Sequence, residues 1–177
     1  MLMTRLASTS PGTPLALRRL IALRWVLLAG ELAAILLAPS VLDVPLPQWP
    51  MLTVVALQCA ANVRTAIRVA RGLPCVDGDL FAQLLIDVGA LSVLLFLSGG
   101  AANPLVSLLL PPVAIAALAL PGVLVTVVAG LAVAAYSLLN FVYLPLPIAD
   151  VSRATQLHLA GMWFTFVVSV GMLAWFL

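Results

Sequence analysis

Long apolar runs separated by short polar segments fill almost the whole sequence. Six runs are long enough to cross about 30 Å of hydrocarbon as helices, near residues 17–38, 50–70, 79–97, 104–120, 121–144 and 155–177. Segments of alternating polarity, which are typical of membrane β-barrels, do not occur in the sequence. The pattern therefore predicts an all-α integral membrane bundle of six transmembrane helices, preceded by a polar N-terminal tail over residues 1–16.

Composition agrees with this prediction and narrows the range of partners. Hydrophobic residues make up 64% of the 177 and charged residues only 8%, too few to cover a water-soluble domain. Membrane lipid is therefore the expected surroundings, and the basic surface needed to bind nucleic acid is missing. The two cysteines, Cys59 and Cys75, do not have the spacing of metal ligands, so neither a metal site nor a disulfide framework is indicated.

The arginines indicate how the chain is oriented. All eight positive charges are arginines, and most lie before or within the start of the first helix and at the end of the second. The loops after the first and third helices have none, and Arg153 in the loop after the fifth lies close to Asp150. Because cytoplasmic segments are enriched in basic residues, we expect both termini to be cytoplasmic. The loops after the first, third and fifth helices then face outward.

The polar turn between the third and fourth helices reads GGAANP. Gly99 and Gly100 suit the left-handed end of a helix, Asn103 suits an N-cap and Pro104 suits the first helical position. This structural interpretation explains every residue type in the turn, and it is favoured on the residues alone.

The same turn also has the properties of a binding site. A helix N-terminus presents free N–H groups, here those of Leu105 and Val106, and the Asn103 amide can donate to a carbonyl. Glycine lets a planar ligand approach the backbone, so a quinone ring is a plausible occupant. Further along, Pro111 and Pro112 leave the carbonyls of neighbouring residues Ser107 and Leu108 unpaired, which predicts a kink in the fourth helix.

Two residues of the sixth helix enter from the same side of the membrane. His158 is expected at the depth of Asn103, and Trp163 about 8 Å deeper at the helical rise. They are either ordinary interfacial residues or a wall of the same binding pocket, with His158 as a hydrogen-bond partner.

Two carboxylates, Glu31 and Asp87, fall near the middle of their helices, where an ionised acid is costly unless it is paired. Three arrangements are open: the acids face each other, they share a proton, or Gln83, Asn62 or water satisfies them. Arg24 either snorkels to the cytoplasmic boundary or pairs there. The sequence contains no catalytic motif, so no catalytic residue is assigned.

Several segments, in order along the chain, resemble one known family. They are LRW at 23–25, AGE at 29–31, GDLFAQLLIDV at 78–88, GGAANPLVSLLLPPVAIAA at 99–117 and LHLAGMW at 157–163. Together they resemble the membrane domain of RegB/PrrB-type redox-sensing histidine kinases. The most specific piece is the family's quinone-associated heptapeptide GGxxNPF, of which Gly99, Gly100, Asn103 and Pro104 match, while Leu105 replaces the aromatic ring.

The resemblance implies a six-helix sensor of the membrane quinone pool in the bacterial inner membrane. It implies ubiquinone as the sensed ligand, a homodimer, signalling through the sixth helix to a cytoplasmic kinase, and a response regulator as partner. Glu31 stands where a glutamine is expected. The family continues into a kinase core, whereas this chain stops at Leu177 inside an apolar run, so we expect it to be the sensor part alone.

Two alternatives stay open. One is a standalone small membrane transporter or assembly protein that uses Glu31 and Asp87 for coupling. The other is a helical bundle whose role is dimerisation only. Both are compatible with six apolar spans.

Overall fold

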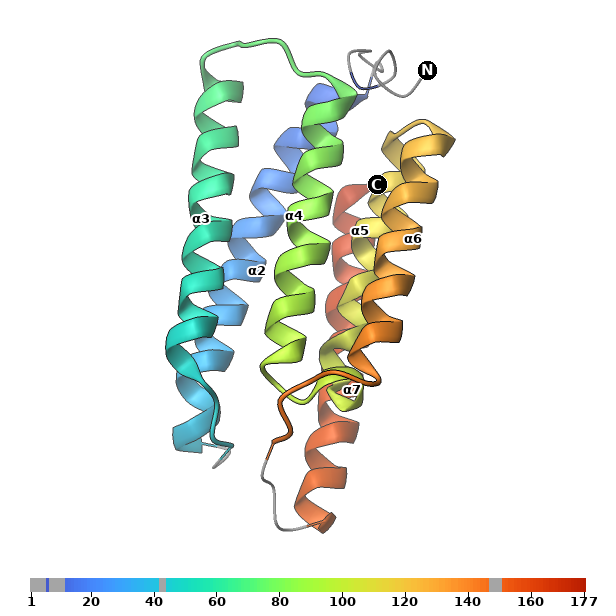
Figure 1. Cartoon of the computed structure of the whole chain (residues 1–177). Helices are drawn as coiled ribbons and strands as arrows, with labels where there is room; N and C mark the ends of the chain where they lie inside the picture. The colour runs from blue at the N-terminus through green and yellow to red at the C-terminus, as the bar shows by residue number, and fades with distance from the viewer. Residues whose placement is uncertain (1–5, 7–11, 42–43, 147–150) are drawn as a thin grey trace.

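Long helices that run up and down along one axis make up the computed structural model (Figure 1). The structure describes residues 6, 12–41, 44–146 and 151–177. The main elements in these ranges are helices α2 (Thr13–Val41), α3 (Gln48–Ala70), α4 (Asp77–Phe96), α5 (Leu110–Ala119), α6 (Gly122–Leu139) and α7 (Val151–Phe176), with 3-10 segments η1 (Gly100–Ala102) and η2 (Pro104–Leu109). Five helices are long and apolar enough to cross a membrane, and Pro104–Ala119 forms a shorter apolar helix. The all-α class is confirmed.

The first helix begins at Thr13 rather than at residue 17, so the predicted polar tail is too long. Thr13 Oγ1 donates a 2.6 Å hydrogen bond to Asp77 Oδ1, and both residues are fully buried. This bond holds the start of α2 against the start of α4. Of the residues used to predict orientation, Asp150 lies outside the described residues, and Arg153 is described by its backbone only.

The fourth predicted span is divided into η2 and α5. The predicted unpaired carbonyl at Ser107 is wrong, because Leu110 N donates to Ser107 O in 3-10 fashion. The predicted kink stays a prediction. Pro111 and Pro112 lie in the first turn of α5, where a missing N–H leaves no bond unmade. The prolines thus lie where the 3-10 segment changes to an α-helix.

The fifth span also ends early, at Leu139 rather than at residue 144. Asn140 Nδ2 donates to Tyr136 O at 2.8 Å, and Leu144, which precedes a proline, leaves the helical conformation. Leu144 N instead donates to Phe96 O at 2.8 Å. This hydrogen bond therefore holds the segment after α6 against the end of α4.

The connections alternate between two ends of the bundle. The segments between α2 and α3, between α4 and η2, and after α6 lie at one end, which we call the loop end, and the start of α2 and the end of α7 lie toward the other (Figure 1). The Arg19 guanidinium donates to the Phe176 carbonyl, which joins these two helix ends. The alternation is the one predicted from six spans, and the side of the membrane that each end faces stays a prediction.

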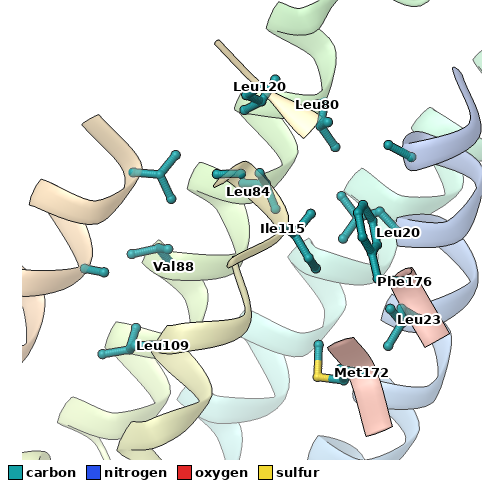
Figure 2. Close-up of a cluster of buried hydrophobic side chains, with 14 of the residues drawn as sticks. Leu20, Leu23, Leu80, Leu84, Val88, Leu109, Ile115, Leu120, Met172 and Phe176 are labelled. Carbon is teal, nitrogen blue, oxygen red and sulfur yellow. The ribbon is translucent and has the colours of Figure 1, made fainter. Parts of the chain in front are cut away.

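The apolar core lies among α2, α4, α5, α6 and α7. Figure 2 shows Leu84 of α4, Ile115 of α5 and Met172 of α7 converging with Leu20 of α2. Large apolar side chains such as Phe166 point outward instead, as expected for helices surrounded by lipid. Packing and polar contacts therefore hold the helices together, since lipid tails are as apolar as the core.

Candidate functional site

A cavity of about 540 Å³ lies at the loop end of the bundle. Its walls come from the turn after α4, from α2 and α3, from the segment after α6 and from the start of α7. Five of the seven predicted ligand-binding residues line it: Gly99, Asn103, Pro104, Leu105 and His158. The remaining walls are mostly apolar and include Ile35, Met51 and Leu146. We call this space the loop-end cavity.

Asn103 holds the turn together through its own side chain. Its Oδ1 accepts from Leu105 N at 2.9 Å, and its Nδ2 donates to Ser98 O at 2.8 Å and to Ser98 Oγ at 2.9 Å. The predicted N-cap is confirmed. The predicted free donors are wrong, because Leu105 N and the Asn103 amide are engaged within the turn and Val106 N donates to Asn103 O. Asn103 shapes the cavity and has no amide proton left for a ligand.

The two glycines have different roles. Both are left-handed as predicted, with φ of 101° at Gly99 and 65° at Gly100. Gly99 lines the cavity, but Gly100 does not. A Cβ on Gly100 would lie 2.6 Å from Tyr143 and 2.7 Å from the Leu139 carbonyl oxygen. Gly100 therefore lets the end of α6 approach the turn, which corrects its assignment as a ligand-binding residue.

His158 contacts the turn directly. Its Nδ1 lies 3.1 Å from the Ala102 carbonyl oxygen. A carbonyl oxygen only accepts hydrogen bonds, so Nδ1 carries the proton, and Nε2 of the neutral ring is an acceptor. Trp163 is 68% exposed and does not line the cavity, so its assignment to the pocket is wrong. Trp163 lies on the outer face of α7, as expected for a tryptophan that faces lipid.

Gly161 and Thr165 join α7 to η2, a contact that was not predicted from the sequence. A Cβ on Gly161 would lie 2.3 Å from Pro104 Cγ, and Thr165 Oγ1 donates to Pro104 O at 3.1 Å. Gly161 also lines the cavity. The signal in the sequence was a glycine about one turn after His158.

Gly161→Ala is expected to destabilise the protein by about 1–3 kcal/mol, because the added methyl group meets a rigid proline ring. Thermal unfolding in detergent followed by circular dichroism measures the loss. Gly171→Ala is the matched control on the same helix, where a Cβ meets nothing within 4 Å. Equal stability of the two variants would contradict the close contact between α7 and η2.

The sequence did not predict that α2 and α3 form one wall of the loop-end cavity, or that Tyr143 from the segment after α6 lines it. Tyr143 lines the cavity and carries a side-chain hydroxyl that can donate to a ligand oxygen. Contacts between helices distant in sequence leave no mark in a uniformly apolar pattern.

Asp87 forms an ion pair with Arg24, whose side chain is 2% exposed, with Nη2 2.7 Å from Oδ1. The same guanidinium donates to the Gln83 side-chain oxygen and, at 2.8 Å, to the Gln83 carbonyl. Arg24 therefore pairs inside the bundle and does not snorkel. The nearest partner of Asp87 is thus Arg24 of α2, which was not among the arrangements considered from the sequence.

Glu31 has a separate partner on α3. Gln58 Nε2 donates to Glu31 Oε2 at 3.2 Å. Asn62, considered from the sequence as a partner for the acids, donates to the Ile21 carbonyl instead. The two acids thus belong to one buried polar region but have different nearest partners.

The described residues contain no group of three or more His, Cys, Asp or Glu side chains that could hold a metal ion. The arrangement at the loop end suits reversible binding of an apolar molecule that carries oxygen atoms. No nucleophile paired with a base lines the loop-end cavity among the described residues.

Comparison with known proteins agrees with the resemblance found in the sequence. A family model described as the PilS-like transmembrane domain matches residues 40–177. The sensor histidine kinase RegB of Cereibacter sphaeroides is 33% identical over 156 residues, which cover 87% of this chain and 34% of that protein. The chain thus spans about a third of the length of this relative. No solved structure matches.

The family match extends over more than half of the chain, from the end of α2 through α7. With its relative among bacterial sensor kinases, it agrees with the multi-pass helical fold and with a location in the bacterial inner membrane. The chain belongs to the family of PilS-like transmembrane domains, and within it to the RegB-type membrane sensor domains.

Proposed function

We propose that this chain is the membrane-embedded redox sensor of a two-component histidine kinase, and that it binds a ubiquinone-type quinone in the loop-end cavity. The observation that carries the proposal is the cavity itself, with mostly apolar walls and the His158 imidazole beside the GGAANP turn. Its volume of about 540 Å³ lies within the range of small-molecule sites. A lipid-soluble ligand reaches such a site from the bilayer.

The side chains around the cavity distinguish the two redox forms. A quinol carries hydroxyl groups that donate, whereas a quinone carries carbonyls that only accept. Nε2 of neutral His158 accepts a hydrogen bond and therefore favours the quinol. The Tyr143 hydroxyl can donate a hydrogen bond to a carbonyl of the quinone. Leu105 offers aliphatic packing to the ring where the related heptapeptide offers an aromatic face.

Ligand binding would act on the rest of the protein through α7. His158 and Gly161 lie in the wall of the cavity, and α7 continues from there along the length of the bundle. A ligand that shifts the contact between η2 and α7 changes the position of the whole helix. In the proposed function, α7 passes this change to a cytoplasmic kinase dimer that phosphorylates a response regulator.

The test measures binding of a short-chain ubiquinone, oxidised and reduced, to the protein in lipid nanodiscs by calorimetry. His158→Leu is expected to weaken quinol binding about tenfold, the effect of one lost hydrogen bond, and to leave quinone binding unchanged. Tyr143→Phe is expected to weaken quinone binding by a similar factor. Asn103→Ala is unsuitable because it breaks the turn.

Tyr136→Phe is the matched control, since Tyr136 lies on α6 outside the cavity and is expected to leave both affinities unchanged. Wild-type protein that binds neither form would overturn the proposal. Equal quinol affinity in His158→Leu and wild type would remove the role of the imidazole.

A further inference from the structure

A second, much smaller cavity lies within the bundle, away from the loop end. Its volume is about 40 Å³, enough for a small number of water molecules and far too little for a quinone. Arg24, Glu31, Gln58 and Asp87 form its polar side. The side formed by α5 and α7 is apolar and includes Pro112, Ile115 and Met172. We call it the mid-bundle cavity.

Arg24 brings an unused hydrogen-bond donor to this cavity. Its side chain is 2% exposed, and its two terminal nitrogens are engaged by Asp87 and Gln83. Its Nε is buried and has no hydrogen-bond partner among the described residues. Buried donors of this kind are nearly always satisfied by protein or by ordered water. A water in the mid-bundle cavity would accept from Nε and have carboxylate oxygens within the same walls to donate to.

The charges around the cavity do not balance. Arginine does not lose its proton in proteins, so Arg24 contributes one positive charge. Glu31 and Asp87 contribute two negative charges when both are ionised. The remaining groups that face them are the neutral amides of Gln58 and Gln83 and the apolar side of the cavity. A net negative charge inside hydrocarbon is costly, and one added proton removes it.

The contacts decide which acid takes the proton. Asp87 lies 2.7 Å from the guanidinium, which favours its ionised form. The partner of Glu31 among the described residues is the neutral Gln58 amide, at 3.2 Å. A protonated Glu31 would donate to the Gln58 side-chain oxygen after rotation of that amide, so the α2–α3 contact survives in either state but reverses its direction.

We infer that the mid-bundle cavity is a proton-binding site, in which Glu31 takes up one proton through water held by Arg24 Nε. The site is separate from the loop-end cavity and does not depend on quinone binding. The proton arrives as hydronium: one O–H bond of the hydronium breaks, an O–H bond to the Glu31 carboxylate forms, and a neutral water molecule is left in the cavity. Because Met172 of α7 closes the cavity, the same helix touches both sites.

Infrared spectroscopy of the full chain in quinone-free nanodiscs tests the inference through the C=O stretch of a protonated carboxyl group. Wild type is expected to show this band near neutral pH, and Glu31→Gln to lose it. Asp87→Asn is expected to lose it too, because Arg24 then balances an ionised Glu31. Asp79→Asn is the control, since that acid pairs with Arg68 away from the cavity.

Three results would overturn the inference. The first is a wild-type spectrum without the band near neutral pH, and the second is a band that survives Glu31→Gln. The third is a band that disappears on adding sodium at constant pH, which would mark a cation site. These three infrared results do not depend on whether the protein binds quinone. The proton site and the quinone site can therefore be contradicted independently.

Discussion

Arg24→Met is expected to lower the free energy of unfolding by about 3–5 kcal/mol, the usual effect of removing one partner of a buried ion pair. The variant leaves Asp87 without its cation, and the exposed fraction of the Asp87 side chain is only 14%. It also removes the two guanidinium N–H groups that donate to the side-chain and backbone oxygens of Gln83. Unfolding in mixed micelles, titrated with a denaturing detergent and followed by circular dichroism, measures the change.

Two further variants show whether the ion pair is the cause. Arg64→Met makes the same replacement at an exposed position of α3 and is expected to change stability by no more than about 0.5 kcal/mol. Arg24→Met combined with Asp87→Leu removes both charges and is expected to recover much of the loss. A double variant as unstable as Arg24→Met alone would show that the ion pair does not explain the effect.

Gly100→Ala is expected to cost about 2–5 kcal/mol, from two separate causes. A left-handed backbone costs an alanine about 1–2 kcal/mol, and overpacking against Tyr143 adds about 1–3 kcal/mol. The backbone φ is 65°, and the new methyl group would lie 2.6 Å from Tyr143. The thermal midpoint in detergent gives the loss. Quinone affinity is expected to fall as well, because Tyr143 lines the loop-end cavity.

Gly72→Ala separates the two causes. Gly72 has nearly the same φ, 66°, but a Cβ there meets nothing within 4 Å. It is expected to show the backbone cost alone and to leave quinone affinity unchanged. If both variants lose the same stability, the end of α6 does not pack on Gly100 as the structure has it.

Features of the fold that depend on neighbouring residues could be predicted from the sequence. The left-handed Gly99 and the cap formed by Asn103 were both predicted, because a turn is decided by the residues within it. The spans were found because crossing a bilayer requires a minimum length of apolar helix. The predicted ends of the spans were less accurate, because the positions of Thr13 and Leu144 depend on hydrogen bonds to residues of α4.

Features that depend on which face of a helix meets its neighbours could not be predicted. In a soluble helix the polar side reveals the exposed face, but in lipid both faces are apolar. Trp163 was therefore placed in the pocket although it points outward, and Gly161 was missed. The ion pair between Arg24 and Asp87 was not among the arrangements considered from the sequence, because it depends on the packing of α2 against α4.

The 3-10 form of η2 has a consequence for how the short fourth segment fits the bilayer. A 3-10 helix rises about 2.0 Å per residue and an α-helix about 1.5 Å. The 6 residues of η2 and the 10 of α5 therefore reach about 27 Å, where the same chain as one α-helix would reach about 24 Å. Pro111 and Pro112 favour the longer form at the end of η2, because they lack the N–H groups that would make α-helical bonds to the Ser107 and Leu108 carbonyls. The 3-10 conformation of η2 thus brings the length of the fourth segment, which would be too short as an α-helix, close to the thickness of the hydrocarbon.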